Sequence, residues 1–474
     1  MQYLQKINAN KLTACVVLLL VIKLLIDIYF PMAALDGPWY LSHAFSVING
    51  HQFKNTFAAD YIDFYNLPYL YGDLPAAFYF PFAHTSLNIY SIFIINFLLV
   101  NLLLYLCYKL YTIYKKHIDF MFMLFCGAVI FSPATYLQRP ETWVLILILL
   151  FHLYLIKYAA NTSLLYYIVT AFFITAALLI HPVGGIYMAV FFTVYSFENK
   201  TTFRQYFFTA VSAVIIFFIA YAPFVLINVT AWKLNFFTRG YSNDERSVSF
   251  DHVIQFYTYA YPFLGVCILY LSAYRLKRLV KEVGILLLFI VILLPFGRYY
   301  YYAYLFHLVL WRIALIEDFK APWWKKIVAA IFILPGSIQV FGLPIFQLTE
   351  NRAYAPTFTN VLRQSRNTAL QNPQVKVWVS PSVAMAVIDQ PNGRLHYQHY
   401  VDVRGEKPVI KNDIFLIENF GMKNYLEHFI DTSKDSLIVE NIIPPVKGLQ
   451  RLGLHESRSD SLGLWKVTVI KKLQ

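Results

Sequence analysis

Charged residues are scarce in this chain of 474 residues: Lys, Arg, Asp and Glu together make up 14% of it. Soluble globular domains carry about 25%. Hydrophobic residues make up 59% and aromatic residues 18%, so the composition argues against a soluble domain and predicts an integral membrane protein. The net charge of +13 does not indicate nucleic-acid binding, because Lys and Arg fall in short clusters between apolar runs rather than in one basic stripe.

Cysteines and familiar enzyme motifs are also few. All four cysteines lie in apolar runs and the C-terminal segment has none, which argues against a disulfide framework. The chain has no G-x-G-x-x-G motif, no P-loop and no G-x-S-x-G in a suitable context, so the common soluble nucleotide-dependent sites are unsupported. No spacing of His, Asp and Glu resembles H-E-x-x-H. We therefore expect no cofactor, and a divalent metal has no support in the sequence.

Long apolar runs, by contrast, fill the first 341 residues. A helix needs about 20 apolar residues to cross about 30 Å of hydrocarbon, and these runs reach or approach that length. They predict a polytopic α-helical membrane protein of about eleven transmembrane helices. The predicted segments are 12–30, 86–112, 119–137, 142–158, 163–180, 183–198, 205–227, 256–274, 283–296, 301–317 and 325–341.

Basic residues in the short loops predict the orientation of these segments. Their clusters alternate with the segments and so share one face, which the positive-inside rule makes cytosolic. The N-terminus is then cytosolic and the C-terminal segment external. We expect a bacterial plasma membrane, because the chain carries no C-terminal retention signal. The clusters contain Lys6 and Lys11; Lys109, Lys115 and Lys116; Lys157; Lys200 and Arg204; Arg275, Lys277, Arg278 and Lys281; Lys320, Lys325 and Lys326.

The segment 342–474 differs from the rest of the chain. Its hydropathy falls, and short β-branched runs alternate with helix-compatible stretches such as 421–429. About 130 residues suffice for one small domain, and we predict an α/β domain outside the cytosol. Its strands are predicted at 375–380, 413–418, 436–440 and 464–470.

The external loop 31–85 contains the most informative stretch. Asp36 precedes a short helix that Pro38 suits as a first turn and Asn49-Gly50 ends. A carboxylate here acts as a general base where a low local dielectric raises its basicity. It also fits a helix cap, and the residues alone leave both readings open. An apolar stripe places the helix in the membrane interface; it consists of Leu41, Ala44, Phe45 and Ile48.

Four short motifs lie, in order, at the predicted external ends of the helices. They are Asp36 with a following helix that carries Tyr40 and Ala44 and closes on Gly50, the proline and aromatic run 72–81, Arg139-Pro140-Glu141, and His181-Pro182. In their order along the chain and their common position on the external side of the membrane, the four motifs resemble those of the GT-C membrane glycosyltransferases. The resemblance is to the protein O-mannosyltransferase and aminoarabinose-transferase branch in particular.

The resemblance implies an inverting transfer of a sugar from a polyprenyl-phosphate donor to an acceptor on the external face, with Asp36 as catalytic base. Gly37 stands where the protein O-mannosyltransferases commonly have an acidic residue, so the acceptor stays open between a glycolipid, a glycan and a protein. The missing nucleotide motifs also favour a lipid-linked donor. The expected partners are this donor, membrane lipids and the acceptor, with no nucleic acid.

Charged residues at the same face complete the predicted substrate site. A phosphate leaving group needs fixed positive charge, and Arg298 and Arg139 are the external candidates. Arg298 stands beside a run of tyrosines and is also explained as an interfacial anchor. Three roles are open for Glu141: it holds the acceptor, it assists Asp36, or it pairs with Arg139 and caps its helix.

Four further residues belong to the predicted set. Asp60 and Asp63 lie among aromatic residues, a combination common in sugar sites, although a solvated loop explains them as well. Tyr40 and His181 join the set through the resemblance.

Two other functions stay open. A lipid or sugar transporter would line the middle of several helices with charges; Lys23 and Asp27, one turn apart in the first segment, are expected to form a structural pair or part of a relay. A membrane anchor or assembly factor would act only by presenting the C-terminal domain.

Overall fold

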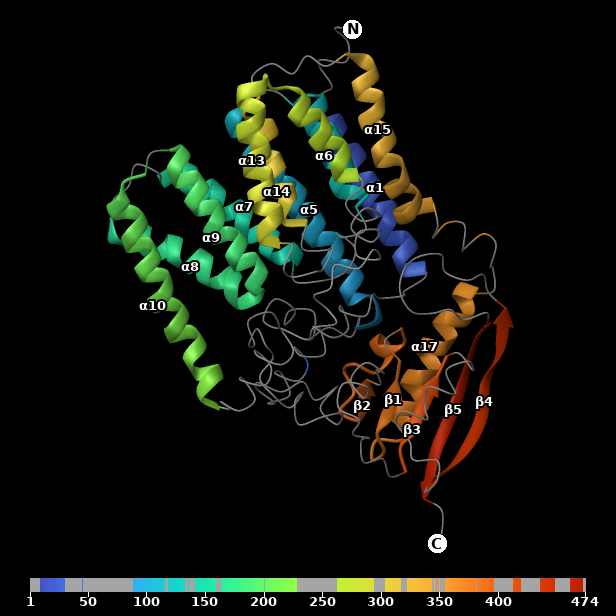
Figure 1. Ribbon diagram of the computed structural model, residues 1–474. Coiled ribbons are helices and arrows are strands. Elements are labelled where there is room, and N and C mark those ends of the chain that lie inside the picture. Colours follow the sequence, from blue (N-terminus) through green and yellow to red (C-terminus); the bar gives the residue numbers. More distant parts are fainter. Residues whose placement is uncertain are drawn as a thin grey trace. The chain divides into compact units, whose positions relative to one another are not determined.

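The computed structural model divides the chain into two compact units (Figure 1). The helical unit includes Asn96–Val229 and Phe236–Gly342, and the sheet unit includes Leu343–Gln474. The structure describes residues 9–29, 45, 88–115, 118–132, 135, 141–158, 163–199, 201–227, 262–293, 303–316, 322–342, 345, 349, 354–380, 382–395, 412–418, 435–447 and 461–471.

Each apolar segment predicted from the sequence overlaps one helix, but the bounds differ. The helix Leu276–Leu293 begins seven residues before the predicted segment 283–296, so Lys277, Arg278 and Lys281 lie in a helix and not in the predicted loop. Within the described residues, four helices are long and apolar enough to cross a membrane: Ile92–Tyr114, Glu141–Tyr158, Phe203–Ala220 and Trp323–Gly342. The protein is therefore mostly helical with the character of a membrane protein, while the number of spans stays a prediction.

The helices have the following bounds: α1 (Ala9–Tyr29), α5 (Asn88–Tyr114), α6 (Phe120–Ile130), α7 (Glu141–Tyr158), α8 (Leu164–Ile180), α9 (Pro182–Glu198), α10 (Phe203–Ile227), Pro262–Ser272, α13 (Leu276–Leu293), α14 (Leu305–Ala314), α15 (Trp323–Ser337) with the π-helical turn Ile338–Gly342, and α17 (Tyr354–Gln371).

Asp119 sets the start of α6 and ties it to the end of α5. Its Oδ1 accepts from the backbone N–H of Phe122 at 3.1 Å and from the Tyr111 hydroxyl at 2.6 Å, and its Oδ2 pairs with Lys115 Nζ at 2.6 Å. Asp is a favoured residue at this position, because its carboxylate satisfies a backbone donor that the first helical turn leaves unpaired. One side chain thus caps α6 and holds α5 against it.

A single residue, His181, joins α8 to α9. Its backbone is extended, with φ −156° and ψ 115°, and Pro182 begins α9, where the missing N–H costs nothing. Gly185 lies against the backbone of Leu178, where any Cβ would overlap it, so α8 and α9 approach closely. The turn lies where the sequence predicts it.

Around this hairpin, α8 packs against α7 and α10, and α9 packs against α7 and α13. α14 packs against α6 and α7, and its ten residues are all buried. Since it is covered on every side, α14 forms part of the core of the helical unit, and its polar residues His307 and Arg312 are buried there.

The sheet unit contains a five-stranded sheet of order β2-β1-β3-β5-β4. The first three strands in this order are parallel, and β5 is antiparallel to both β3 and β4. The four predicted strands are confirmed, although β4 and β5 are longer than predicted. β2 was not predicted, because its sequence Gly-Arg-Leu contains no β-branched residue. The strands are β1 (Val377–Val379), β2 (Gly393–Leu395), β3 (Ile414–Ile417), β4 (Asp435–Lys447) and β5 (Ser461–Lys471).

α17 packs against β4 and β5 and was not predicted from the sequence. Arg366 in α17 makes a two-pronged ion pair with Asp389 at 2.9 and 2.8 Å, a geometry that suits the planar guanidinium. Asn392 Nδ2 donates to three backbone carbonyls between residues 369 and 375. These contacts fix the connections around β1. The predicted helix at 421–429 lies outside the described residues.

Candidate functional site

Two of the predicted site residues, Glu141 and His181, lie in the part of the chain that the structure describes. The other six fall outside it: Asp36, Tyr40, Asp60, Asp63, Arg139 and Arg298. In α1, Lys23 is buried, and its pairing with Asp27 stays a prediction.

Glu141 and His181 come together with a third residue, Tyr304. His181 Nε2 lies 3.8 Å from Glu141 Oε1, and the side chains are 1% and 5% exposed. On the other side of the imidazole, the Tyr304 hydroxyl lies 3.3 Å from Nδ1. Glu141 begins α7, His181 joins α8 to α9, and Tyr304 immediately precedes α14. We call these three residues the carboxylate–imidazole cluster.

Gly184 makes room for this cluster. A Cβ added at Gly184 would meet Val144 Cγ1 and would lie 3.1 Å from Tyr304 Oη and 3.2 Å from its Cζ. Since real Cβ atoms rarely come this close to several atoms at once, a larger residue would displace Val144 and crowd Tyr304. Glycine in the first turn of α9 therefore lets the Tyr304 hydroxyl reach His181.

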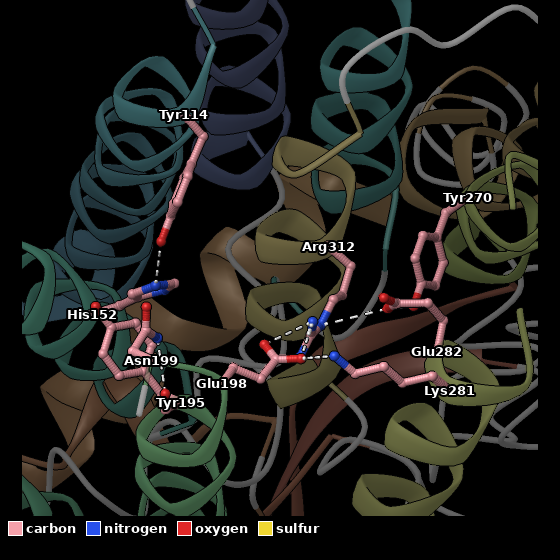
Figure 2. Close-up of polar contacts among 9 residues, drawn as sticks. All are labelled: Tyr114, His152, Tyr195, Glu198, Asn199, Tyr270, Lys281, Glu282 and Arg312. Atoms are coloured by element: carbon pink, nitrogen blue, oxygen red, sulfur yellow. Dashed lines mark hydrogen bonds and ion pairs between the residues drawn. The ribbon is translucent and has the colours of Figure 1, made fainter. Parts of the chain in front are cut away.

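A second buried arrangement, the histidine chain, links four helices. His152 Nδ1 lies 3.0 Å from His307 Nε2, the Tyr187 hydroxyl lies 3.2 Å from His307 Nδ1, and the Tyr114 hydroxyl lies 3.2 Å from His152 Nε2. The four residues belong to α5, α7, α9 and α14, and Figure 2 shows the contact between Tyr114 and His152.

Every member of the histidine chain can both donate and accept a hydrogen bond, because a neutral imidazole has one donor and one acceptor nitrogen and a phenol does both. Two imidazole and two phenolic protons therefore suffice for the three contacts, in either direction. The Tyr187 and Tyr304 ring centroids lie 5.7 Å apart, so the histidine chain adjoins the carboxylate–imidazole cluster.

The spacing of polar and aromatic residues around His307 indicates, from the sequence alone, which face of its helix carries the polar contacts. Tyr304, His307 and Trp311 recur at intervals of three and four, which places them on one face of α14. In the structure the rings of His307 and Trp311 both lie against Phe191 of α9, at 4.5 and 5.3 Å between centroids. Polar groups that share one face of an apolar helix indicate that this face packs against neighbouring helices.

Charged residues form a third group, the arginine cluster, at the end of α9 (Figure 2). Arg312 Nη1 lies 3.0 Å from Glu198, and Arg312 Nε lies 3.7 Å from Glu282 Oε2. Lys281 Nζ pairs with Glu198 at 2.8 Å, and the Tyr270 hydroxyl donates to Glu282 at 2.8 Å. Arg312 and Glu282 are buried charges that the sequence analysis did not single out.

The arginine cluster brings two cations and two carboxylates together, so its formal charge is balanced. Buried charges persist where opposite charges and hydrogen bonds compensate them, and this cluster joins α9, α13 and α14. Its geometry is that of a structural ion-pair network.

The carboxylate–imidazole cluster has different chemistry. A carboxylate and an imidazole side by side can hold and pass a proton, and the Tyr304 hydroxyl orients the ring. Among the described residues, no group of three or more His, Cys, Asp or Glu side chains is placed to hold a metal ion. The cluster is therefore suited to positioning and to acid–base work.

Comparison of the chain with protein-family models, with curated proteins and with solved structures gives no match.

Proposed function

We propose that the protein is an inverting membrane glycosyltransferase of the GT-C type, which moves a sugar from a polyprenyl-phosphate donor to an acceptor on the external face. The observation that carries the proposal is the buried contact between Glu141 and His181. Both belong to the set that the sequence places on the same side of the membrane as Asp36. The proposal includes eleven spans, a cytosolic N-terminus and a bacterial plasma membrane.

In this reaction Asp36 accepts the proton of an acceptor hydroxyl while the hydroxyl oxygen bonds to the anomeric carbon of the sugar. The bond between that carbon and the phosphate oxygen breaks, and the lipid phosphate leaves with the electron pair. Arg298 and Arg139 stabilise the charge that develops on the phosphate. Glu141, held by His181, orients the acceptor, with Asp60, Asp63 and Tyr40 around the sugar.

The direct test is mass spectrometry of membrane glycolipids and glycans from cells with and without the gene. One product lacking one sugar would identify the acceptor and the sugar together. Complementation with Asp36→Asn is expected to lower product formation by about 10²- to 10⁴-fold, because the amide cannot take the proton. Asp460→Asn, the same change in the C-terminal segment, serves as the control. Product at wild-type level from Asp36→Asn would remove Asp36 from the mechanism.

Transport of a lipid or sugar is the second candidate, and the histidine chain is the observation that favours it. Polar residues buried among apolar helices often mark substrate or proton pathways. Purified protein in liposomes distinguishes the two functions: a transporter moves the lipid or sugar without a covalent product, whereas a transferase forms a new glycosidic bond. A liposome assay that shows movement and no product would replace the first proposal by the second.

A further inference from the structure

The sheet unit has a polar cluster at one edge of its sheet. β1 lies between β2 and β3 and is parallel to both, so the carboxyl ends of β1 and β3 meet at the same edge. From there the chain continues from β1 to β2 on one side, and from β3 towards β4 and β5 on the other. In open α/β sheets, ligands bind at such a point, where neighbouring connections leave in opposite directions.

Three side chains lie directly after these two strand ends. Ser380 and Ser382 follow β1, and Glu418 follows β3. Glu418 Oε1 lies 2.6 Å from Ser380 Oγ and 2.5 Å from Ser382 Oγ, and the two serine oxygens lie 2.9 Å apart. Ser380 and Glu418 are 1% and 6% exposed, whereas Ser382 is half-buried, so the cluster reaches the surface of the unit through Ser382.

The hydrogen-bonding capacity of this cluster is unbalanced. The two serine hydroxyls carry one proton each, and both protons are used by the contacts with Glu418 Oε1. Glu418 Oε2 is buried and has no hydrogen-bond partner in the described part of the chain. A buried carboxylate oxygen without a donor is costly. Among the described residues the site thus has acceptors to spare and no donor for Glu418 Oε2, and a ligand that brings donors would satisfy it.

We propose that Glu418, Ser380 and Ser382 bind the hydroxyl groups of a saccharide. Adjacent hydroxyls can donate to Glu418 Oε2 and to the remaining lone pair of a serine, which satisfies the acceptors that the protein leaves over. A divalent cation fits less well, because hard cations take six or more oxygen ligands and this cluster supplies one carboxylate. The choice of a saccharide, rather than another donor-rich ligand, rests on the proposed glycosyl transfer.

The test is saturation-transfer difference NMR on the full-length protein in phospholipid nanodiscs, which avoids sugar-based detergents. The probes are methyl glycosides of glucose, mannose, galactose, arabinose and N-acetylglucosamine. At least one is expected to bind the wild type. Glu418→Gln is expected to weaken that binding by about tenfold or more, because the amide places a donor where the ligand needs an acceptor.

Three variants keep the result interpretable. Ser382→Ala changes a half-buried residue and leaves the buried core intact. It should weaken the binding of the same sugar by a smaller factor than Glu418→Gln does. Glu440→Gln makes the same chemical change on an exposed residue of β4 and should bind like the wild type. Asp36→Asn should also bind like the wild type, since Asp36 is not one of the three residues of the proposed saccharide site.

Binding by none of the five glycosides, or equal binding by wild type and Glu418→Gln, overturns the saccharide site; in that case a buried water takes the place of the ligand. Sugar binding that depends on Glu418 in a protein without transferase activity would support this site while the proposed function fails. Transferase activity without such binding gives the reverse outcome.

Discussion

The two ends of α9 hold buried polar groups in opposite ways. At its start, His181 and Glu141 lie 3.8 Å apart, which is longer than a hydrogen bond. At its end, Glu198 lies 3.0 Å from Arg312 and 2.8 Å from Lys281. The helix has 17 residues, so about 25 Å separates the two groups.

This difference separates two uses of buried polarity. The arginine cluster balances opposite charges within the protein and joins three helices, with Arg312 3.0 Å from Glu198 and 3.7 Å from Glu282, which is what stability requires. The carboxylate–imidazole cluster instead brings a carboxylate, an imidazole and a phenol together, groups that readily exchange protons, as expected at a functional site. Substitutions at the end of α9 should therefore affect stability most, and those at its start should affect function most.

The largest effect on stability is expected from Arg312→Ala. Removing the guanidinium leaves Glu282 buried without its cation, and breaking a buried pair in this way costs about 3–5 kcal/mol. Denaturant unfolding in mixed micelles measures the loss. Lys281→Ala is the matched control, because Lys281 is 59% exposed and exposed pairs contribute at most about 1 kcal/mol. Equal losses in the two variants would contradict a structural role for the buried arginine.

A smaller loss is expected from Gly184→Ala. The new methyl group would meet Val144 and the Tyr304 hydroxyl, and overpacking of this kind costs about 1–3 kcal/mol. Because Tyr304 would move away from His181, product formation should fall as well. Gly284→Ala, where a Cβ meets nothing within 4 Å, is the matched control. Unchanged stability and activity in Gly184→Ala would show that Tyr304 does not depend on this glycine.

The smallest effect on stability is expected from Glu141→Gln. Glutamine keeps the size and shape of the buried side chain and can still form hydrogen bonds, so the free energy of unfolding should change by about 1 kcal/mol. Product formation should fall by about tenfold or more, because the amide no longer carries the charge that orients the acceptor. Activity and unfolding of the same preparation give both values. A large loss of stability with normal activity would make Glu141 structural and reverse the comparison.

The sequence predicted the helices well because apolar run length and charge-free composition determine where a helix can be buried in lipid. The short turn at His181-Pro182 was also predicted from the sequence, since proline favours the first turn of a helix. In the sheet unit, β-branched runs located β1, β3, β4 and β5, but β2 has the sequence Gly-Arg-Leu and no β-branched residue. α17 is amphipathic, with Ala355, Phe358, Leu362 and Ala369 buried at helical spacing, a pattern that a search for long apolar runs does not detect.

The site was harder to predict. Glu141 and His181 were chosen separately, and only the packing of α7 against the hairpin of α8 and α9 shows that they meet. The histidine chain combines four helices, so no local motif contains it. Arg312 could have been found, because a cation inside an apolar run requires a partner; its partners Glu198 and Glu282 come from α9 and α13, which the sequence does not bring together.

The one-residue junction at His181 also constrains how the protein is made. With no loop between Ile180 and Pro182, and with Gly185 lying against Leu178, α8 and α9 form a tight pair. In the proposed topology of eleven spans, this pair enters the bilayer as one unit. The imidazole at the tip of that pair crosses the hydrocarbon first. Glu141 and Tyr304 then give His181 polar neighbours once the flanking helices assemble. His181, which we assign to the site, therefore also favours the packing of α8 and α9 against those helices.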